Sequence, residues 1–124
     1  MAKKIALPSA LPGGLEAGMG MHFGHCECYT IVDVDDEGKV TQVSVKPPVD
    51  HAQGGCLAPV MYLADMGVTD LLAGGMGLRP MMGFLQNGVK VFYAGQCATI
   101  GQAVQMHLQG QLPAFSPENT CRGH

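Results

Sequence analysis

The hydrophobic pattern changes its period once along the chain, and this change restricts the fold more than any other feature of the sequence. Up to about residue 50, apolar residues alternate with polar ones in short runs, a pattern typical of β-strands. Beyond that point, runs with helical spacing alternate with short apolar runs, and glycines separate them. Alternating strands and helices predict an α/β domain with parallel strands and right-handed crossovers.

We therefore predict a five-stranded mixed sheet with three helices. Pro8 is expected to end the first strand, and the second and third strands form a hairpin around Asp35–Gly38. The domain covers residues 3–110, and residues 111–124 are expected to form a mobile tail because they lack an apolar period. The predicted strands are Lys3–Leu7, Cys28–Val34, Val40–Val45, Val68–Ala73 and Val89–Tyr93, and the predicted helices are Cys56–Met66, Leu78–Gln86 and Thr99–Leu108.

Four of the predicted strands share one direction, because only the second strand runs antiparallel to the others. Their carboxyl ends therefore meet at one edge of the sheet, which is where ligands bind in open α/β sheets. The loops at 8–27, 47–55, 74–77 and 94–98 leave from or return to this edge. We expect the ligand-binding groups of the protein to lie there.

The most distinctive segment is Met21–Cys28, which holds two histidines and two cysteines. Imidazole and thiolate bind soft and borderline metals, so His22, His25, Cys26 and Cys28 are candidate metal ligands. Two simpler explanations stay open: the loop side chains have no function, or Cys28 is only the first inward-facing residue of its strand. Further candidate ligands lie in another loop and in the tail, at His51, Cys56, Cys121 and His124.

Glycine-rich loops precede all three predicted helices. Glycine allows the backbone to approach a ligand closely, and helix N-termini present N–H groups with positive potential. Three such ends at one edge would bind an anion, although tight turns alone also explain each loop. The residues expected to hold an anionic ligand are Gly55, Gly74, Gly75, Met76, Gly77, Arg79, Gly95, Cys97 and Ala98.

Composition argues against several partners and compartments. The net charge is −3, and the seven Lys and Arg residues are scattered, so we expect no nucleic acid partner. No apolar run approaches the roughly 20 residues of a membrane-spanning helix, and the stretch after Lys4 stops at Pro8, too early for a secretory signal. We expect a cytoplasmic protein with reduced thiols, in which clustered Cys and His indicate metal or redox chemistry.

Several segments together resemble a known family. They are His22–Gly24 (His-Phe-Gly), the aromatic strand Tyr29–Asp33, Gly74–Gly77 (Gly-Gly-Met-Gly) and Ala94–Gln96 (Ala-Gly-Gln). Over residues 3–110 they resemble the nitrogenase iron-molybdenum cofactor biosynthesis family, which includes cofactor carriers and the orange protein of sulfate reducers. The resemblance implies a ribonuclease H-like three-layer fold that binds metal-sulfur clusters or their precursors. The family histidine matches His22, whereas His25, Cys26 and Cys28 are additional to the family pattern.

We therefore expect a non-catalytic carrier or assembly factor for a metal-sulfur cluster, of the molybdenum-copper sulfide, iron-molybdenum or iron-sulfur type. Its partners would be the cluster and a cluster-assembly or ATPase protein. A nuclease, which the implied fold also allows, needs clustered carboxylates, but Lys3–Leu7 contains none. The acidic residues of the predicted hairpin turn lie at the opposite end of the sheet from the ligand edge. The alternative is a protein that binds single Cu(I) or Zn(II) ions through its His/Cys-rich loop.

Overall fold

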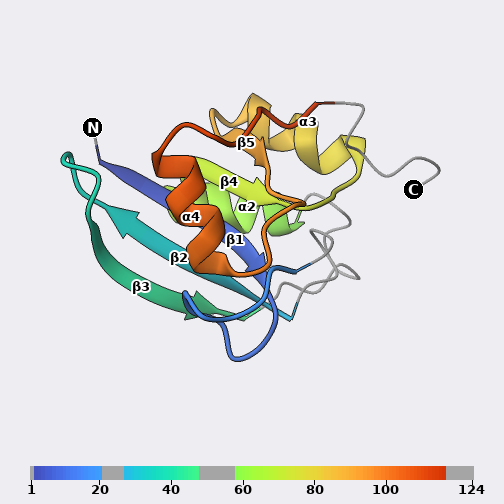
Figure 1. Cartoon of the computed structure of the whole chain (residues 1–124). Coiled ribbons are helices and arrows are strands. Elements are labelled where there is room, and N and C mark those ends of the chain that lie inside the picture. Colours follow the sequence, from blue (N-terminus) through green and yellow to red (C-terminus); the bar gives the residue numbers. More distant parts are fainter. Residues whose placement is uncertain (1, 21–26, 48–57, 117–124) are drawn as a thin grey trace.

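The protein folds into a mixed five-stranded sheet with helices on both faces (Figure 1). The computed structural model describes residues 2–20, 27–47 and 58–116. Over these residues the prediction of five strands and three helices is confirmed. The elements are β1 (Lys3–Ser9), β2 (Cys28–Val34), β3 (Val40–Lys46), α2 (Ala58–Asp65), β4 (Asp70–Ala73), α3 (Leu78–Gln86), β5 (Lys90–Tyr93) and α4 (Ile100–Leu108).

The sheet has the strand order β3-β2-β1-β4-β5. β4 and β5 run parallel to β1, β2 runs antiparallel to β1, and β3 runs antiparallel to β2. Four strands therefore point in one direction, as predicted. The loops that contain Gly75 and Cys97 follow β4 and β5 and leave from the same edge of the sheet.

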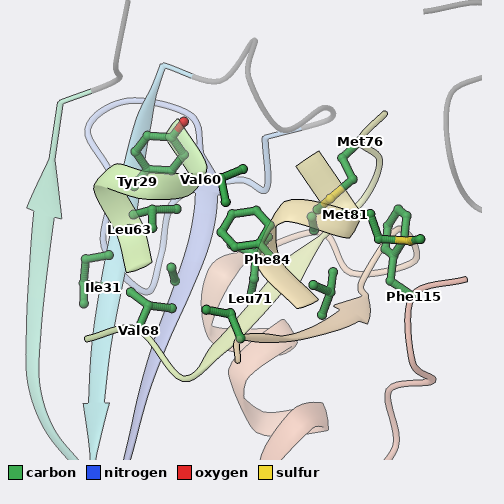
Figure 2. Close-up of a cluster of buried hydrophobic side chains, with 14 residues drawn as sticks. Tyr29, Ile31, Val60, Leu63, Val68, Leu71, Met76, Met81, Phe84 and Phe115 are labelled. Atoms are coloured by element: carbon green, nitrogen blue, oxygen red, sulfur yellow. The ribbon is translucent and has the colours of Figure 1, made fainter. Parts of the chain in front are cut away.

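The strands bury alternate residues on the two faces of the sheet, and each face has its own hydrophobic core. On one face, strand residues such as Tyr29, Ile31 and Leu71 pack against α2 and α3, and Figure 2 shows Phe84 of α3 within this cluster. On the other face, Ile5, Leu7 and their neighbours pack against α4. Because the side-chain period of a strand is two, neighbouring residues such as Leu71 and Leu72 belong to different cores.

The first strand is longer than predicted. Pro8 does not end it, because Pro8 pairs with Tyr29 and Ser9 pairs with Cys28. β4 pairs with β1 only at Ile5 and Ala6, so Pro8 lies beyond the parallel ladder. Proline lacks the N–H group that a central strand uses to pair with both of its neighbours. Pro8 is tolerated because at this position β1 pairs with β2 alone. The other described boundaries agree with the prediction within one or two residues, and residues 56 and 57 lie outside the described part.

The segment after α4 also differs from the prediction. The backbone N–H of Tyr93 donates to the carbonyl of Pro113 at 2.9 Å, and that of Phe115 donates to the carbonyl of Val91 at 2.9 Å. Phe115 is buried and its ring lies 5.9 Å from that of Tyr93. Residues 113–115 therefore pack along the outer edge of β5, where we expected a mobile tail. The rest of that tail, from residue 117, lies outside the described residues.

A buried hydrogen bond between Asp70 and His107 joins β4 to α4 at the edge opposite to the ligand edge. Nε2 of His107 lies 2.6 Å from Oδ2 of Asp70, and both side chains are about nineteen-twentieths buried. The amino group of Lys3 lies 3.9 Å from the same oxygen, and the Phe92 ring packs on His107. Burial alone would raise the pKa of Asp70. Hydrogen bonds with His107 and Thr69, and the charges of His107 and Lys3, outweigh burial and lower the pKa below 3.8.

We predict that this pair stabilises the fold above pH 4 and loses its contribution in acid. A carboxyl whose pKa is lower in the folded state contributes stability above its unfolded pKa of 3.8 and loses it as the pH falls through the folded value. Urea unfolding between pH 7 and pH 2 should show this loss. Asp70→Asn should lower the free energy of unfolding by about 3 kcal/mol at pH 7, because it removes one partner of a buried pair. The variant should also show a smaller loss of stability between pH 4 and pH 2 than the wild type.

The exposed Asp65 of α2 provides the control. Asp65→Asn should change the free energy of unfolding by less than about 0.5 kcal/mol, and it should lose as much stability in acid as the wild type does. If the wild type and Asp70→Asn lost equal stability as the pH falls below 4, the pair would not control the stability of the protein in acid.

Candidate functional site

The candidate site lies at the edge where β1, β3, β4 and β5 end and β2 begins (Figure 1). Pairing of Ser9 with Cys28, and of Ala73 with Tyr93, aligns the strand ends across this edge. Strand direction thus brings residues that are far apart in the sequence to one place. The chemistry at this edge depends on which loop residues are exposed and which backbone groups lack partners.

Eight of the predicted site residues lie outside the described residues: His22, His25, Cys26, His51, Gly55, Cys56, Cys121 and His124. The residues that flank the first three are described. The backbone N–H of Gly20 donates to the carbonyl of Pro8 at 2.8 Å, and that of Glu27 donates to the carbonyl of Ser9 at 3.1 Å. Both ends of segment 21–26 are therefore attached to the carboxyl end of β1, at the predicted edge.

Cys28 lies at this edge but its thiol is directed into the protein. The residue is 2% exposed, and its Sγ lies 3.8 Å from the carbonyl oxygen of Ser9 and 3.6 Å from that of Ala10. A Cβ on Gly13 would lie 3.2 Å from the sulfur, so the loop after β1 packs closely over it. This is the position expected of the first inward-facing residue of a strand.

Two further predicted site residues are part of the hydrophobic cores. Met76 is fully buried, and Figure 2 shows it beside Met81 in the cluster beneath α3. Cys97 is 7% exposed and belongs to the core beneath α4, where its thiol lies 3.7 Å from the sulfur of Met106. Burial raises the pKa of the Cys97 thiol, which favours its neutral form.

The N-terminus of α4 is closed by the protein itself, which corrects the expectation of an anion-binding end at Ala98. The loop after β1 crosses to this helix, where the N–H groups of Ile100 and Gly101 donate to the carbonyls of Ala17 and Leu15 at 2.9 and 2.7 Å. Among the remaining groups, the Thr99 hydroxyl accepts from Gln102 N–H at 3.2 Å, and the Gln102 amide oxygen accepts from Ala98 N–H at 2.9 Å. The first-turn N–H groups are used internally, so none is left for a ligand.

Gly95 also has an internal role. A Cβ at this position would collide with the phenol of Tyr93, which folds back over the turn. A larger residue at position 95 would force the Tyr93 ring to shift, so the close approach of that ring accounts for glycine here and a ligand need not be invoked.

The N-terminus of α3 differs from that of α4. Gly77 is its N-cap and provides no side-chain hydrogen bond, and no described residue accepts a hydrogen bond from the N–H of Leu78 or Arg79. Arg79 is exposed, and no described carboxylate forms an ion pair with it. A cation at a helix N-terminus is unfavourable without an anion nearby. Gly74, Gly75 and Gly77 form the loop that leads to this end from β4.

Within residues 2–20, 27–47 and 58–116, no three His, Cys, Asp or Glu side chains come together as a metal site. In the same ranges, no helix is both long and apolar enough to cross a membrane. The Asp70–His107 pair was missed by the sequence analysis, because a buried hydrogen bond between residues 37 positions apart has no signal in sequence spacing.

Comparison with known proteins places these features in a family. The pattern of the dinitrogenase iron-molybdenum cofactor family matches residues 1–110. An uncharacterised protein of Methanocaldococcus jannaschii is 26% identical over 113 residues, which cover 90% of this chain and 91% of that protein.

Two solved structures share the fold. The apo form of the orange protein from Desulfovibrio gigas has a TM-score of 0.73 and 24% identity, over 92% of this chain and 93% of that one. The protein PH0822 has a TM-score of 0.74 and 23% identity, over 90% of this chain and 96% of that one. At this level of identity the two structures establish the fold alone. Since the family pattern covers nearly the whole described domain, the chain belongs to the dinitrogenase iron-molybdenum cofactor family.

Proposed function

We propose that the protein is a non-catalytic carrier or assembly factor that holds a metal-sulfur cluster or its precursor at the carboxyl edge of the sheet. The observation that carries this proposal is the attachment of both ends of segment 21–26 to the end of β1. That segment contains His22, His25 and Cys26. The chain belongs to a family that is named after the iron-molybdenum cofactor of dinitrogenase, and this name supports the proposal that the protein binds a cluster.

The anionic cargo would be held by two kinds of group. The sulfides of such a cluster accept hydrogen bonds, and the N–H groups of Leu78 and Arg79 at the start of α3 have no described acceptor. The exposed guanidinium of Arg79 adds positive charge beside them. Histidine and thiolate side chains of the 21–26 segment would bind the metal.

Among the two cysteines of the His/Cys-rich segment, we assign the ligand role to Cys26. The thiol of Cys28 is directed toward two backbone carbonyls inside the protein, and moving it outward would break the packing of Gly13 over it. His22, which matches the family histidine, is the second proposed ligand. His25, His51, Cys56, Cys121 and His124 remain proposed ligands on the basis of their sequence positions.

The type of cluster, the compartment and the partner protein are parts of the same proposal. We propose a molybdenum-copper sulfide or an iron-molybdenum or iron-sulfur cluster, carried in the cytoplasm and received from or delivered to a cluster-assembly or ATPase protein. We also propose the ribonuclease H-like label for the fold, on the basis of the strand order β3-β2-β1-β4-β5 with helices on both faces.

Elemental analysis of the protein isolated from its native source without chelators tests the function. A cluster carrier should contain metal together with acid-labile sulfide and should be coloured. Metal without acid-labile sulfide would overturn the cluster proposal and support the alternative, a protein that binds single Cu(I) or Zn(II) ions.

We predict that Cys26→Ser and Cys28→Ser have different effects. Tetrathiomolybdate, a molybdenum dianion that carries four sulfides, with one equivalent of Cu(I), serves as the cargo probe. Cys26→Ser should reduce its retention on a desalting column by more than about tenfold, because loss of a direct ligand exceeds loss of a supporting group. Cys28→Ser should retain the probe within about twofold of the wild type. Because a thiolate ligand must be deprotonated, retention by the wild type should also decrease at low pH. Equal losses in both variants would contradict this assignment.

We further predict that Arg79→Gln weakens binding of the same probe by about tenfold, the effect of one charge-assisted hydrogen bond of about 1.4 kcal/mol. Lys90→Gln is the matched control, because Lys90 is an exposed cation at the amino end of β5, on the opposite edge of the sheet. Titration by visible absorbance at low and high salt would measure both variants. If the two variants bind the probe equally, the net charge of the protein, and not the position of Arg79, controls binding.

A further inference from the structure

A pair of sulfur atoms lies away from the proposed cargo site, on the α4 side of the sheet. Sγ of Cys97 is 3.7 Å from Sδ of Met106. Cys97 belongs to the turn between β5 and α4, and Met106 lies in the last part of α4. The thiol is buried, whereas Met106 is half-buried.

A cavity of about 200 Å³ adjoins Met106, the member of the pair on α4, whereas Cys97 does not line it. Met106 forms part of its wall, and segment 111–113 closes one side, where the N–H of Gln111 donates to the carbonyl of Met106 at 2.9 Å. The wall is mainly apolar, with a few polar groups from a phenol and two amides. Its lining residues are Tyr93, Gln96, Met106, Gln111, Leu112 and Pro113.

The distance between the sulfurs suits a shared soft metal ion. Two sulfur ligands with metal–sulfur bonds of about 2.3 Å, at tetrahedral to trigonal angles, lie roughly 3.7–4.0 Å apart. Thiolate and thioether are the ligand pair that favours Cu(I) over harder divalent ions. The 3.7 Å separation of Sγ of Cys97 and Sδ of Met106 falls at the lower end of this range.

We propose that Cys97 and Met106 form a Cu(I) site that an ion reaches through the adjoining cavity. On binding, the thiol releases its proton to solvent, and Cu(I) forms one coordinate bond with Sγ of Cys97 and one with Sδ of Met106. No electron is transferred, because copper enters in its reduced state. The site is independent of the cluster proposed above and of its ligands.

The test follows the nine methionines by NMR of their ¹³C-labelled ε-methyl groups. The full-length protein carries Ser in place of Cys26, Cys56 and Cys121, so that Cys28 and Cys97 are its remaining thiols. Cu(I) is added without oxygen as its acetonitrile complex. We expect the methyl signal of Met106, identified by its loss in Met106→Leu, to shift at one equivalent. Met61 and Met82, which are 46% and 45% exposed, should not shift.

Two substitutions in this background separate the site from a general affinity of thiols for copper. Cys97→Ser should abolish the shift of Met106, whereas Cys28→Ser, which removes another buried thiol, should not. Met106→Leu keeps the volume of the side chain and removes its sulfur. It should weaken Cu(I) binding by more than about tenfold in competition with bathocuproine disulfonate.

Three results would overturn the proposal. The Met106 signal could stay in place after the protein has bound one equivalent of Cu(I), it could shift equally in folded Cys97→Ser, or Met106→Leu could bind Cu(I) as tightly as its parent. If circular dichroism shows that Cys97→Ser does not fold, the affinity of Met106→Leu decides. In any of these cases the sulfur contact is a packing interaction of the core.

Discussion

The pairing of β1 on both sides is the constraint on which the rest of the structure depends. β1 is antiparallel to β2 along its whole length and parallel to β4 through Ile5 and Ala6. Its residues Ile5, Ala6 and Leu7 are fully buried between the two helical layers. Because β4 then pairs in parallel with β5, the loops after three strands leave from one edge. The end of β1 also holds both ends of the segment that carries His22, His25 and Cys26.

Among the helices that begin at this edge, α3 and α4 are described together with the residues that precede them, and their N-termini differ. The loop after β1 supplies carbonyls to the first N–H groups of α4, and the contact is close enough that a Cβ on Gly101 would lie 3.0 Å from the carbonyl oxygen of Leu15. α3 begins at Gly77 without a side-chain cap. Of these two helix ends, the one at α4 is satisfied internally and the one at α3 lacks described acceptors, so a ligand would meet positive potential at α3, beside Arg79.

Three sulfur-containing residues of the predicted site lie in the interior. Cys28, Cys97 and Met76 are all buried, each in a different environment: backbone carbonyls, a thioether, and an apolar cluster. A buried thiol with a raised pKa, such as that of Cys97, stays in its neutral form, which is a poor nucleophile. Three of the sulfur-containing residues at or near the predicted edge are thus part of the packed interior.

The sequence by itself determined the elements and their directions, because hydrophobic period and glycine positions are local properties. The limits of β2 and α3 agree fully with the prediction, and the shared edge followed from strand direction alone. Sequence spacing could not show which polar and sulfur groups form hydrogen bonds or packing contacts inside the protein. The closure of α4 by residues 15 and 17, the inward thiol of Cys28, the Asp70–His107 pair and the packing of residues 113–115 on β5 were decided by tertiary structure. Each depends on contacts between distant segments, and such contacts exist only once the sheet has brought those segments together.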